Sequence, residues 1–158
     1  MTIDKEFWKH KSLAAMTNDE WEALCDGCGF CCLYKIEDAD TGEILLTHVA
    51  CRFLDLHSVT CKLYKNRFNA MPTCIKLTPA KVEALDWLPD SCAYRLVLQG
   101  KPLPAWHPLV SGNPDSIHQS SHSIQGKAQQ ESDVNMDHLE DYIIDDAVCI
   151  KPQKKQCE

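Results

Sequence analysis

Four cysteines stand close together near the start of the chain, in a pattern that suits metal binding. They form the run Cys25-Asp-Gly-Cys28-Gly-Phe-Cys31-Cys32, in which Cys-x-x-Cys occurs twice in tandem. Two thiolates at this spacing can reach one tetrahedral centre about 2.3 Å from each sulfur, because a tight turn places both on one side of the chain. A single pair is weak evidence for a metal, whereas two overlapping pairs with a fourth cysteine attached are strong evidence.

Four further cysteines are scattered between positions 51 and 92. Each is a weaker candidate, since a lone buried cysteine often packs as a small hydrophobic side chain. Together they supply enough sulfur for a second site or a larger cluster. The predicted metal ligands are therefore Cys25, Cys28, Cys31, Cys32, Cys51, Cys61, Cys74 and Cys92. Cys149 and Cys157 lie far along the chain and are interpreted as free thiols.

The adjacent pair Cys31-Cys32 limits how these sulfurs can share metals. Side chains of neighbouring residues diverge in most backbone conformations, so it is awkward for both to join one mononuclear site. Either one of them is not a ligand, or the two serve different metal ions or different positions of a cluster. The bacterial ferredoxin run C-x2-C-x2-C-x3-C-P matches only the first three cysteines, so an ordinary ferredoxin fold is not indicated.

Length and composition restrict the class of protein. The chain has 158 residues, of which 44% are hydrophobic, and this suits one domain with a modest core. No window approaches the roughly 18 apolar residues of a membrane span, and the charged first residues lack the apolar core of a signal peptide. We therefore predict a cytoplasmic protein that does not enter a membrane. Reducing conditions there disfavour disulfides, which leaves a secreted, disulfide-stapled domain as the weaker alternative.

Charge is unevenly distributed along the chain. Residues 25–110 carry nine basic and nine acidic side chains, whereas residues 111–158 carry four basic and nine acidic ones. This balance offers no phosphate-binding stripe, so we expect no nucleic-acid partner. Four thiolates around one divalent ion leave a formal charge of about −2, which basic side chains among the cysteines could offset. These are Lys35, Arg52, Lys62, Lys65, Arg67, Lys76 and Arg95, although each one alone is as well explained as a solvated side chain.

Short elements are expected to position the cysteines. Thr17 and Glu20 form a capping-box pattern, which predicts a helix that delivers Cys25 at its C-terminal end. Segments 33–36 and 44–49 flank a polar, glycine-containing turn and predict a β-hairpin.

Later segments carry weaker signals. Thr78-Pro79 predicts the start of another helix, and a further short helix is expected to carry Cys92. Residues 101–114, rich in Pro and Trp, are expected to form an extended strap over the core. Residues 123–127 are read as a weak strand, and 138–144 as an amphipathic piece that docks before a loose end.

The expected fold is α+β: a small, cysteine-rich, metal-nucleated domain with short helices, a β-hairpin and an irregular C-terminal tail. Residues 1–110 are predicted to form a cysteine-cluster metal-binding domain with N-terminal helices. Residues 111–158 are predicted to form a polar and acidic C-terminal extension that packs on this domain or trails from it.

Other polar residues are weaker candidates for ligands or for groups that support the ligands. His48 stands three residues before Cys51, but its place in an expected strand favours packing or exposure, and His107 is expected to be structural. Tyr64 and Arg95 each follow a cysteine by three residues and could hydrogen-bond a ligating thiolate. Core packing is the stronger reading for Tyr64, and a surface ion pair is a fair one for Arg95. Solvated side chains are expected for His118, His122 and His138.

Several motifs together resemble one family. The CxxCxxCC run, followed by Cys51-Arg52-Phe53-Leu54 and Cys61-Lys62-Leu63-Tyr64, is similar to the YkgJ-type cysteine-cluster proteins, which are described as zinc- or iron-chelating. The resemblance is closest to the YcgN-like bacterial subgroup, whose role is uncharacterised, and it covers roughly residues 5–145. It implies a metal site at the cysteines and implies no reaction. Further matching motifs are Trp21-Glu22-Ala23-Leu24-Cys25, Cys74-Ile75-Lys76-Leu77, Trp87-Leu88-Pro89, Cys92-Ala93-Tyr94-Arg95 and residues 103–109.

Metal binding is thus the predicted function, with zinc or an iron–sulfur cluster as the cofactor, because soft thiolates suit both. One alternative is an iron–sulfur protein that transfers electrons, senses oxidants or assists an enzyme. Another is a thiol–disulfide switch without metal. No nucleophile elbow, phosphate loop, dinucleotide fingerprint or zincin helix occurs, so whether the chain is an enzyme is left open. The predicted partner is a metal ion or cluster, and a protein partner is also left open.

Overall fold

The computed structural model of the chain describes residues 5–71, 74, 76–85 and 87–144. Its helices are α1 (Asn18–Leu24), α2 (Arg67–Ala70), α3 (Pro79–Ala84), α4 (Ala93–Leu98), α5 (Pro108–Ser111) and α6 (Ser116–Gln119). Its strands are β1 (Leu33–Glu37), β2 (Ile44–Ala50), β3 (Leu54–Asp55), β4 (Thr60–Cys61) and β5 (Gln129–Gln130). Short 3-10 segments are η1 (Phe7–Lys9), η2 (Leu13–Ala15), η3 (Phe30–Cys32), η4 (Tyr64–Asn66), η5 (Glu131–Asp133) and η6 (Met136–Tyr142).

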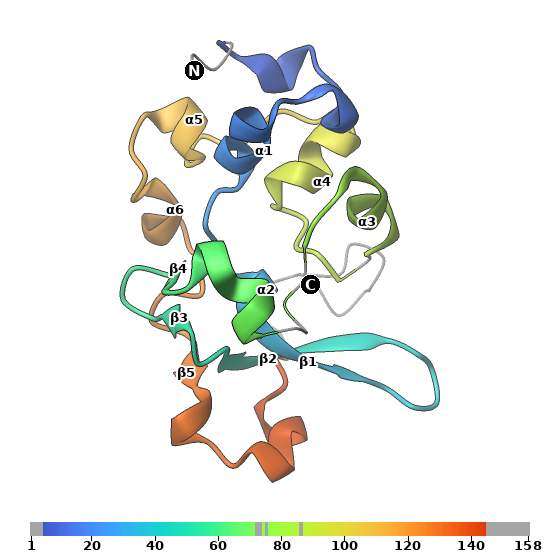
Figure 1. Cartoon of the computed structure of the whole chain (residues 1–158), viewed down its shortest axis with the longest axis vertical. Helices are drawn as coiled ribbons and strands as arrows, with labels where there is room; N and C mark the ends of the chain where they lie inside the picture. The colour runs from blue at the N-terminus through green and yellow to red at the C-terminus, as the bar shows by residue number, and fades with distance from the viewer. Residues whose placement is uncertain (1–4, 72–73, 75, 86, 145–158) are drawn as a thin grey trace.

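These elements give a mixed α+β architecture, as the sequence predicts. Helices α1, α3, α4, α5 and α6 gather toward one end of the molecule, and the strands lie toward the other (Figure 1). Strands β1 and β2 form the predicted antiparallel hairpin, with Lys35 opposite Leu46. Strand β5 pairs parallel with β2, so a segment late in the chain completes a three-stranded sheet. A second, two-stranded sheet places Leu54 of β3 opposite Cys61 of β4.

Helix α1 begins and ends where the sequence predicts. The Thr17 hydroxyl accepts a hydrogen bond from the backbone N–H of Glu20 at 3.2 Å, and the Glu20 carboxylate accepts one from the N–H of Thr17 at 2.9 Å. This reciprocal capping box satisfies two N–H groups that the first helical turn leaves unpaired. The ammonium group of Lys11 also contacts the buried Glu20 carboxylate, at 2.8 Å. The cap therefore defines where the helix starts and how far before Cys25 it runs.

Two of the weaker predictions for the later segments are wrong. The segment 101–114 is not an extended strap throughout, because helix α5 interrupts it. The His107 ring caps this helix by accepting the N–H of Leu109 at 3.0 Å, and Pro108 takes the first helical position, which suits the fixed φ of proline. Residues 123–127 form a turn and not a strand, closed by a 2.8 Å bond from the N–H of Lys127 to the carbonyl of Ile124.

Docking of the segment 138–144 is confirmed. Ile143 forms an isolated antiparallel bridge with Thr47, and the N–H of Ile144 donates to the carbonyl of Leu46 at 2.9 Å. The expected loose end after this segment, and the two cysteines in it, lie outside the described residues.

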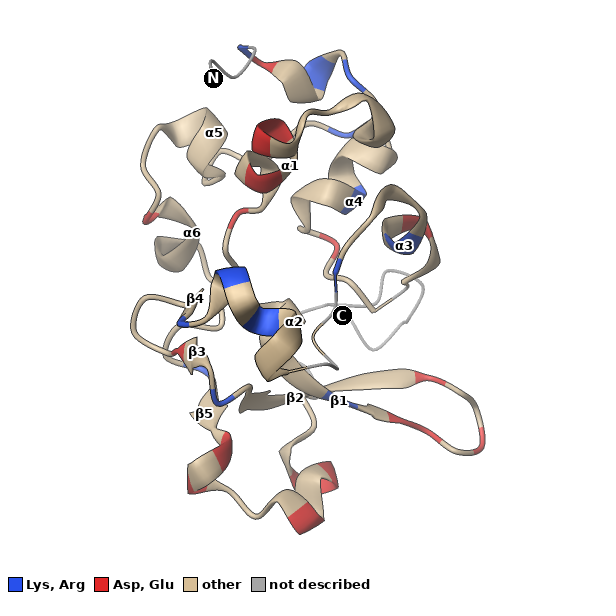
Figure 2. Cartoon of the chain, in the orientation of Figure 1, with Lys and Arg blue, Asp and Glu red and all other residues tan. Residues whose placement is uncertain are grey.

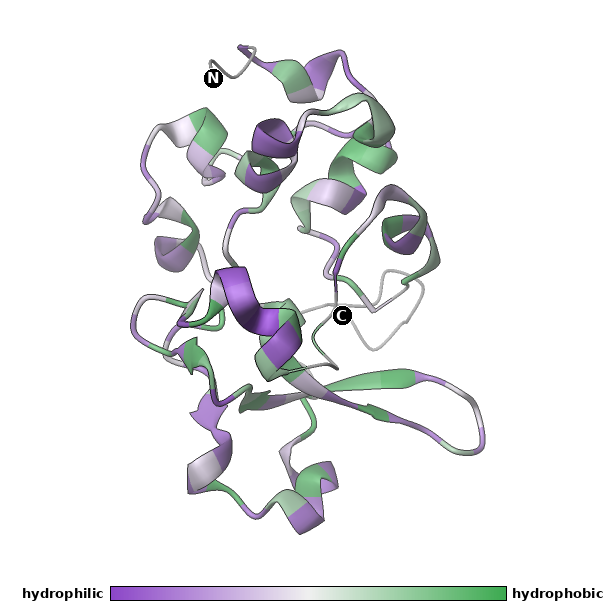
Figure 3. Ribbon diagram, in the orientation of Figure 1, coloured by the Kyte–Doolittle hydropathy of each residue, from purple (hydrophilic) through white to green (hydrophobic). Residues whose placement is uncertain are grey.

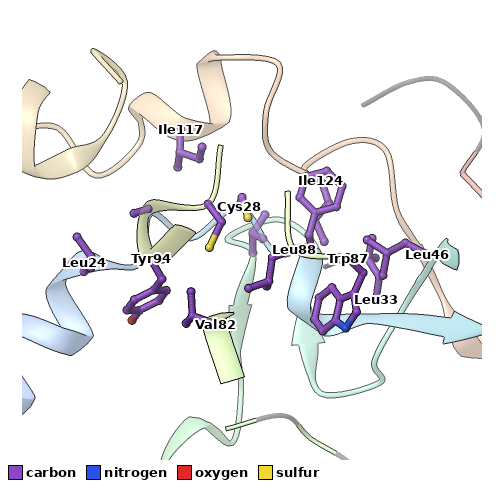
Figure 4. Close-up of a cluster of buried hydrophobic side chains, with 14 of the residues drawn as sticks. Leu24, Cys28, Leu33, Leu46, Val82, Trp87, Leu88, Tyr94, Ile117 and Ile124 are labelled. Atoms are coloured by element: carbon purple, nitrogen blue, oxygen red, sulfur yellow. The ribbon is translucent and has the colours of Figure 1, made fainter. Parts of the chain in front are cut away.

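One hydrophobic core joins the helices to the sheet. Figure 4 shows Cys28 among its apolar side chains. Ile117 and Ile124 are 0% and 3% exposed in this core, so residues after position 110 contribute to the same cluster as earlier ones. The division of the chain at residues 110 and 111 stays a prediction. Buried members on the helical side include Phe7, Leu24, Val82, Trp87, Leu88 and Tyr94.

The surface is polar and carries separate patches of charge. Acidic residues cluster at the turn of the hairpin and on η5 and η6, whereas basic residues lie on η4 and α2 (Figure 2). One arm of the hairpin is largely hydrophobic and its turn is hydrophilic (Figure 3). Among the described residues, every helix is too short or too polar to cross a membrane.

Candidate metal centre

The end of helix α1 and the start of helix α4 bring Cys25 and Cys92 to one region. Cys25 follows the last residue of α1, and Cys92 precedes the first residue of α4. Tyr94 ties the two helices together, since its hydroxyl donates to the carbonyl of Trp21 at 2.6 Å and its ring lies 4.4 Å from the Trp21 ring. Two cysteines that are far apart in sequence therefore share one neighbourhood.

A tight turn carries the chain from Cys25 to the next cysteines. Gly27 and Gly29 have φ angles of 83° and 88°, which glycine adopts without the steric cost that a Cβ brings. The N–H of Cys28 donates to the Asp26 carboxylate at 3.1 Å. The N–H of Ile124 donates to the carbonyl of Cys28 at 2.9 Å and holds the turn against the core. The positive φ angles are thus what lets the Cys-x-x-Cys-x-x-Cys run fold back on itself.

A second neighbourhood forms around Cys32. Its carbonyl accepts a hydrogen bond from the N–H of Cys51 at 2.8 Å, and the carbonyl of Cys51 accepts one from the N–H of Leu54 at 2.9 Å. Leu54 is paired across the small sheet with Cys61. Cys74 completes the group: burial raises the pKa of its thiol, and the nearby thiolate charges of Cys61 and Cys51 raise it further.

All eight predicted ligands are free thiols, so these cysteines form no disulfide with one another. Burial raises the pKa of Cys28 and of Cys31 well above the ordinary value, and nearby charges raise both further. Burial first, then the thiolates of Cys74, Cys51 and Cys61, raise the pKa of Cys32 to about 11. Cys25 keeps exposed surface, yet the protein packed around its thiol and the Asp26 carboxylate raise its pKa too. With no metal ion bound, Cys25, Cys28, Cys31 and Cys32 therefore hold their protons at neutral pH.

The cysteines have the donor atoms that a metal needs, but their side chains are not yet placed around one point. Clustered sulfur donors suit zinc and iron–sulfur clusters. In the part of the chain that the structure describes, however, no three His, Cys, Asp or Glu side chains are placed so that they could hold one metal ion together. Binding by these thiols would require side-chain rotation or small backbone shifts that draw the sulfurs together.

Two of the predicted basic residues are placed to offset thiolate charge. The ammonium group of Lys35 donates to the carbonyls of Cys31 and Leu33 at 3.2 and 2.8 Å, and it lies 4.4 Å from the Trp87 ring centroid. Burial lowers the pKa of Lys35, and nearby cysteines, beginning with Cys31, raise it in part. Burial raises the pKa of Cys74, and the charge of Arg67 and a hydrogen bond from it offset part of that rise. Both cations therefore lie close enough to cysteines to stabilise thiolates.

Arg95 is the third cation near a cysteine. The prediction that it forms a surface ion pair is wrong. Its side chain is buried, with only 6% exposed, and one guanidinium nitrogen donates to the carbonyl of Leu85 at 2.6 Å. The other terminal nitrogen has no hydrogen-bond partner among the described residues. Burial raises the pKa of Cys92, and the backbone N–H and the charge of Arg95 offset part of that rise, so this residue also favours a thiolate nearby.

Asp26 is a site residue that sequence reasoning missed. It is 6% exposed, and burial raises the pKa of its carboxyl. One carboxylate oxygen accepts the N–H of Cys28, whereas the other has no hydrogen-bond partner in the described part of the chain. Its position between Cys25 and the first glycine of the turn was the available signal. The carboxylate shapes the turn, and its charge raises the pKa of the cysteines around it.

Three other residues differ from their sequence-based interpretation. Tyr64 is 47% exposed and donates a short hydrogen bond to Glu22, so it does not pack in the core. His122 stacks on the Trp106 ring at a centroid distance of 4.2 Å and is only partly exposed. His118 shares a 2.8 Å hydrogen bond with Ser123.

His48 and His138 behave as expected. His48 packs edge-on against Tyr142, with ring centroids 5.6 Å apart, and His138 is exposed beside Glu140. Neither ring is part of a group placed to bind a metal among the described residues.

His107 is structural, as predicted, and gives the protein a pH-dependent stability. It is fully buried, Nδ1 accepts the N–H of Leu109, and Nε2 therefore donates to the carbonyl of Leu24 at 2.7 Å. Burial lowers the pKa of His107 from its ordinary 6.5, and the bond to Leu24 and the charge of Asp26 raise it in part.

Acid is therefore expected to destabilise the fold through His107. The folded state keeps the ring neutral, while the unfolded chain takes up a proton near pH 6.5. Above about pH 6.5 the ring is neutral in both states, so His107 does not change the free energy of unfolding. Below that pH the unfolded chain binds a proton that the folded protein does not, so stability falls until the pH reaches the lower pKa of the folded state. An NMR titration of the His107 ring resonances should give a midpoint below the ordinary value of 6.5. A midpoint equal to or above it would contradict this assignment.

Comparison with known proteins gives a consistent family. Residues 24–93, which include all eight predicted ligands, match the CxxCxxCC family, described as "Putative zinc- or iron-chelating domain". Over 144 residues the chain is 54% identical to a UPF0260 protein of Granulibacter bethesdensis, an alignment that covers 91% of this chain and 86% of the relative. A UPF0260 protein of Rhizorhabdus wittichii is 51% identical over 145 residues, covering 92% and 98% of the two chains. One of Rhodopseudomonas palustris is 52% identical over 139 residues, covering 87% and 82%. No solved structure matches the chain.

Proposed function

This chain belongs to the UPF0260 family, and from that premise we propose that it is a metal-binding protein whose clustered thiols hold zinc or an iron–sulfur cluster. The observation that carries the proposal is that the fold gathers free cysteines in two regions, at the ends of α1 and α4 and around Cys32, with three cations beside them. The proposed ligands are Cys25, Cys28, Cys31, Cys32, Cys51, Cys61, Cys74 and Cys92.

Charge balance supports a bound cation. Besides burial, which acts most, neighbouring thiolates raise the pKa of Cys31 and of Cys32, so an uncompensated cluster of thiolates would repel itself. A metal ion removes this repulsion and displaces the thiol protons, because the thiolate is the form that binds metal. Lys35, Arg67 and Arg95 would then balance the negative charge that remains on the metal–thiolate centre.

A thiol–disulfide switch without metal is the weaker function for these residues. Reactive cysteines have a lowered pKa, because the thiolate is the nucleophile. Here burial raises the pKa of Cys28, Cys31 and Cys92, which makes each thiol less reactive at neutral pH. Free thiols also fit the cytoplasm as the proposed compartment, since it keeps cysteines reduced.

Elemental analysis together with an optical spectrum tests the proposal directly. The untagged protein would be purified without oxygen, beside a Cys149→Ser variant as a matched control that removes a cysteine outside the proposed ligand set. We expect near-stoichiometric metal in both. Zinc without visible absorbance would identify a structural zinc protein, whereas iron with acid-labile sulfide and a brown colour would identify a cluster protein. Protein that carries no metal and takes up neither zinc nor iron would overturn the proposal.

A further inference from the structure

We propose that the eight cysteines form two separate four-thiolate metal sites, divided at the peptide bond between Cys31 and Cys32. The inference rests on the proposed function and adds the number of sites and the membership of each. The first set is Cys25, Cys28, Cys31 and Cys92, and the second set is Cys32, Cys51, Cys61 and Cys74.

Backbone contacts bring three members of the second set together. The N–H of Cys51 donates to the carbonyl of Cys32 at 2.8 Å, so these two residues are directly joined. Cys51 then leads through a tight turn to Leu54, which stands opposite Cys61 in the small sheet. The strongest thiolate influences on Cys32 come from Cys74, Cys51 and Cys61, which are the other members of its set.

Helix packing assembles the first set in the same way. The Tyr94–Trp21 contact holds the start of α4 against α1, which places Cys92 and Cys25 at neighbouring helix ends. Cys28 and Cys31 follow Cys25 through the glycine turn, so the three belong to one local loop. The strongest thiolate influences on Cys31 come from Cys92 and Cys25.

The backbone conformation at Cys31 and Cys32 directs their side chains to different sides. Cys31 and Cys32 lie in the 3-10 segment η3. Successive side chains in such a helix point about 120° apart, because there are about 3.0 residues per turn. One of the two can therefore face the helical side of the molecule while the other faces the small sheet. A single mononuclear centre that uses both would have to reverse this divergence.

Cations are distributed to suit two charged centres. A divalent ion with four thiolates carries a formal charge of about −2. Arg95 lies beside Cys92 of the first set, and Arg67 lies beside Cys74 of the second. Lys35 lies between them, since its ammonium group bonds the carbonyl of Cys31 and also senses the charge of Cys32. Each set thus has its own arginine, and the two sets share one lysine.

Metal stoichiometry combined with matched cysteine variants tests the division. The probe is zinc or iron, whichever the purified protein contains, counted by elemental analysis and native mass spectrometry. The wild-type protein should hold two ions or two clusters. Cys25→Ser in the first set and Cys74→Ser in the second should each remove one of the two, and the double variant should remove both.

Spectroscopy distinguishes loss of the same site from loss of different sites. If the metal is zinc, the protein loaded with cadmium should give two 113Cd resonances, and Cys25→Ser and Cys74→Ser should abolish different ones. For iron, two reduced-cluster signals should respond in the same separate manner. These serines replace the exposed Cys25 and the half-buried Cys74, so the fold is disturbed less than by substitution in the core.

Outcomes that contradict the division are distinct from failure of the proposed function. One ion or one cluster per chain in the wild type would overturn the two-site inference and leave metal binding intact. Loss of the same resonance in both variants, or of both resonances in either, would also overturn it. Protein that binds no metal would overturn the proposed function itself, and the two-site inference with it.

Discussion

Removal of the bound metal is expected to abolish cooperative unfolding of the protein or to lower its melting temperature by at least roughly 20 °C. A domain of this size is stable by only about 5–15 kcal/mol. Binding of a structural zinc ion contributes about 10–16 kcal/mol. The free energy of metal binding is thus as large as the total stability, so the chain without metal is expected to be largely unfolded.

The short secondary-structure elements explain why the fold would depend on the free energy of metal binding. Strands β3 and β4 have two residues each, and helix α2 has four. Isolated elements this short are not stable in water, so something else must hold them in place. The proposed second set includes Cys51, Cys61 and Cys74, which flank these three elements. Leu54 and Val59 anchor part of this region in the core, and metal–sulfur bonds would hold the ends that these two side chains do not reach.

The measurement is thermal unfolding followed by circular dichroism before and after chelation. Adding the metal back to the chelated protein is the control, because it should restore the original melting curve. The metal content of each sample must be determined as well. An unchanged melting curve in protein shown to be metal-free would refute a structural role for the metal.

Gly29→Ala is expected to destabilise the protein by about 2–5 kcal/mol, or to lower its melting temperature by roughly 4–20 °C. Gly29 has a φ of +88°, a conformation that costs other residues energy. A Cβ at this position would also lie 2.6 Å from side-chain carbons of both Ile124 and Val59. Both neighbours are buried in the core and cannot move aside freely. Displacing Ile124 would also disturb its hydrogen bond to Cys28.

Gly27→Ala is the matched control, because it shares the backbone strain without the clash. Gly27 has a φ of +83°, and a Cβ there would meet nothing within 4 Å. The expected loss is about 1–2 kcal/mol. Denaturant unfolding of both variants separates the two contributions. Equal losses for the two would show that contact with Ile124 and Val59 does not constrain the turn.

The amino-acid sequence determined the parts of this protein that depend on neighbouring residues. The capping box predicted helix α1, and two segments flanking a polar, glycine-containing turn predicted the hairpin of β1 and β2. Both signals act over a few residues, so they survive without knowledge of the rest of the fold. The Cys-x-x-Cys spacing is local in the same sense, and it indicated metal chemistry before any contact was known.

Tertiary structure alone decided the arrangements that depend on residues far apart in the chain. Strand β5 exists because Gln129 meets the edge of β2, and no pattern within residues 123–130 specifies that pairing. Arg95 was expected at the surface, but packing of helix α4 buries it. The partners of each cysteine are likewise set by long-range contacts, such as Tyr94 on Trp21. The spacing of the cysteines identifies the candidate ligands, but only the packing of distant segments determines which cysteines are neighbours. Each such contact joins residues that are far apart along the chain, where local sequence patterns carry no signal.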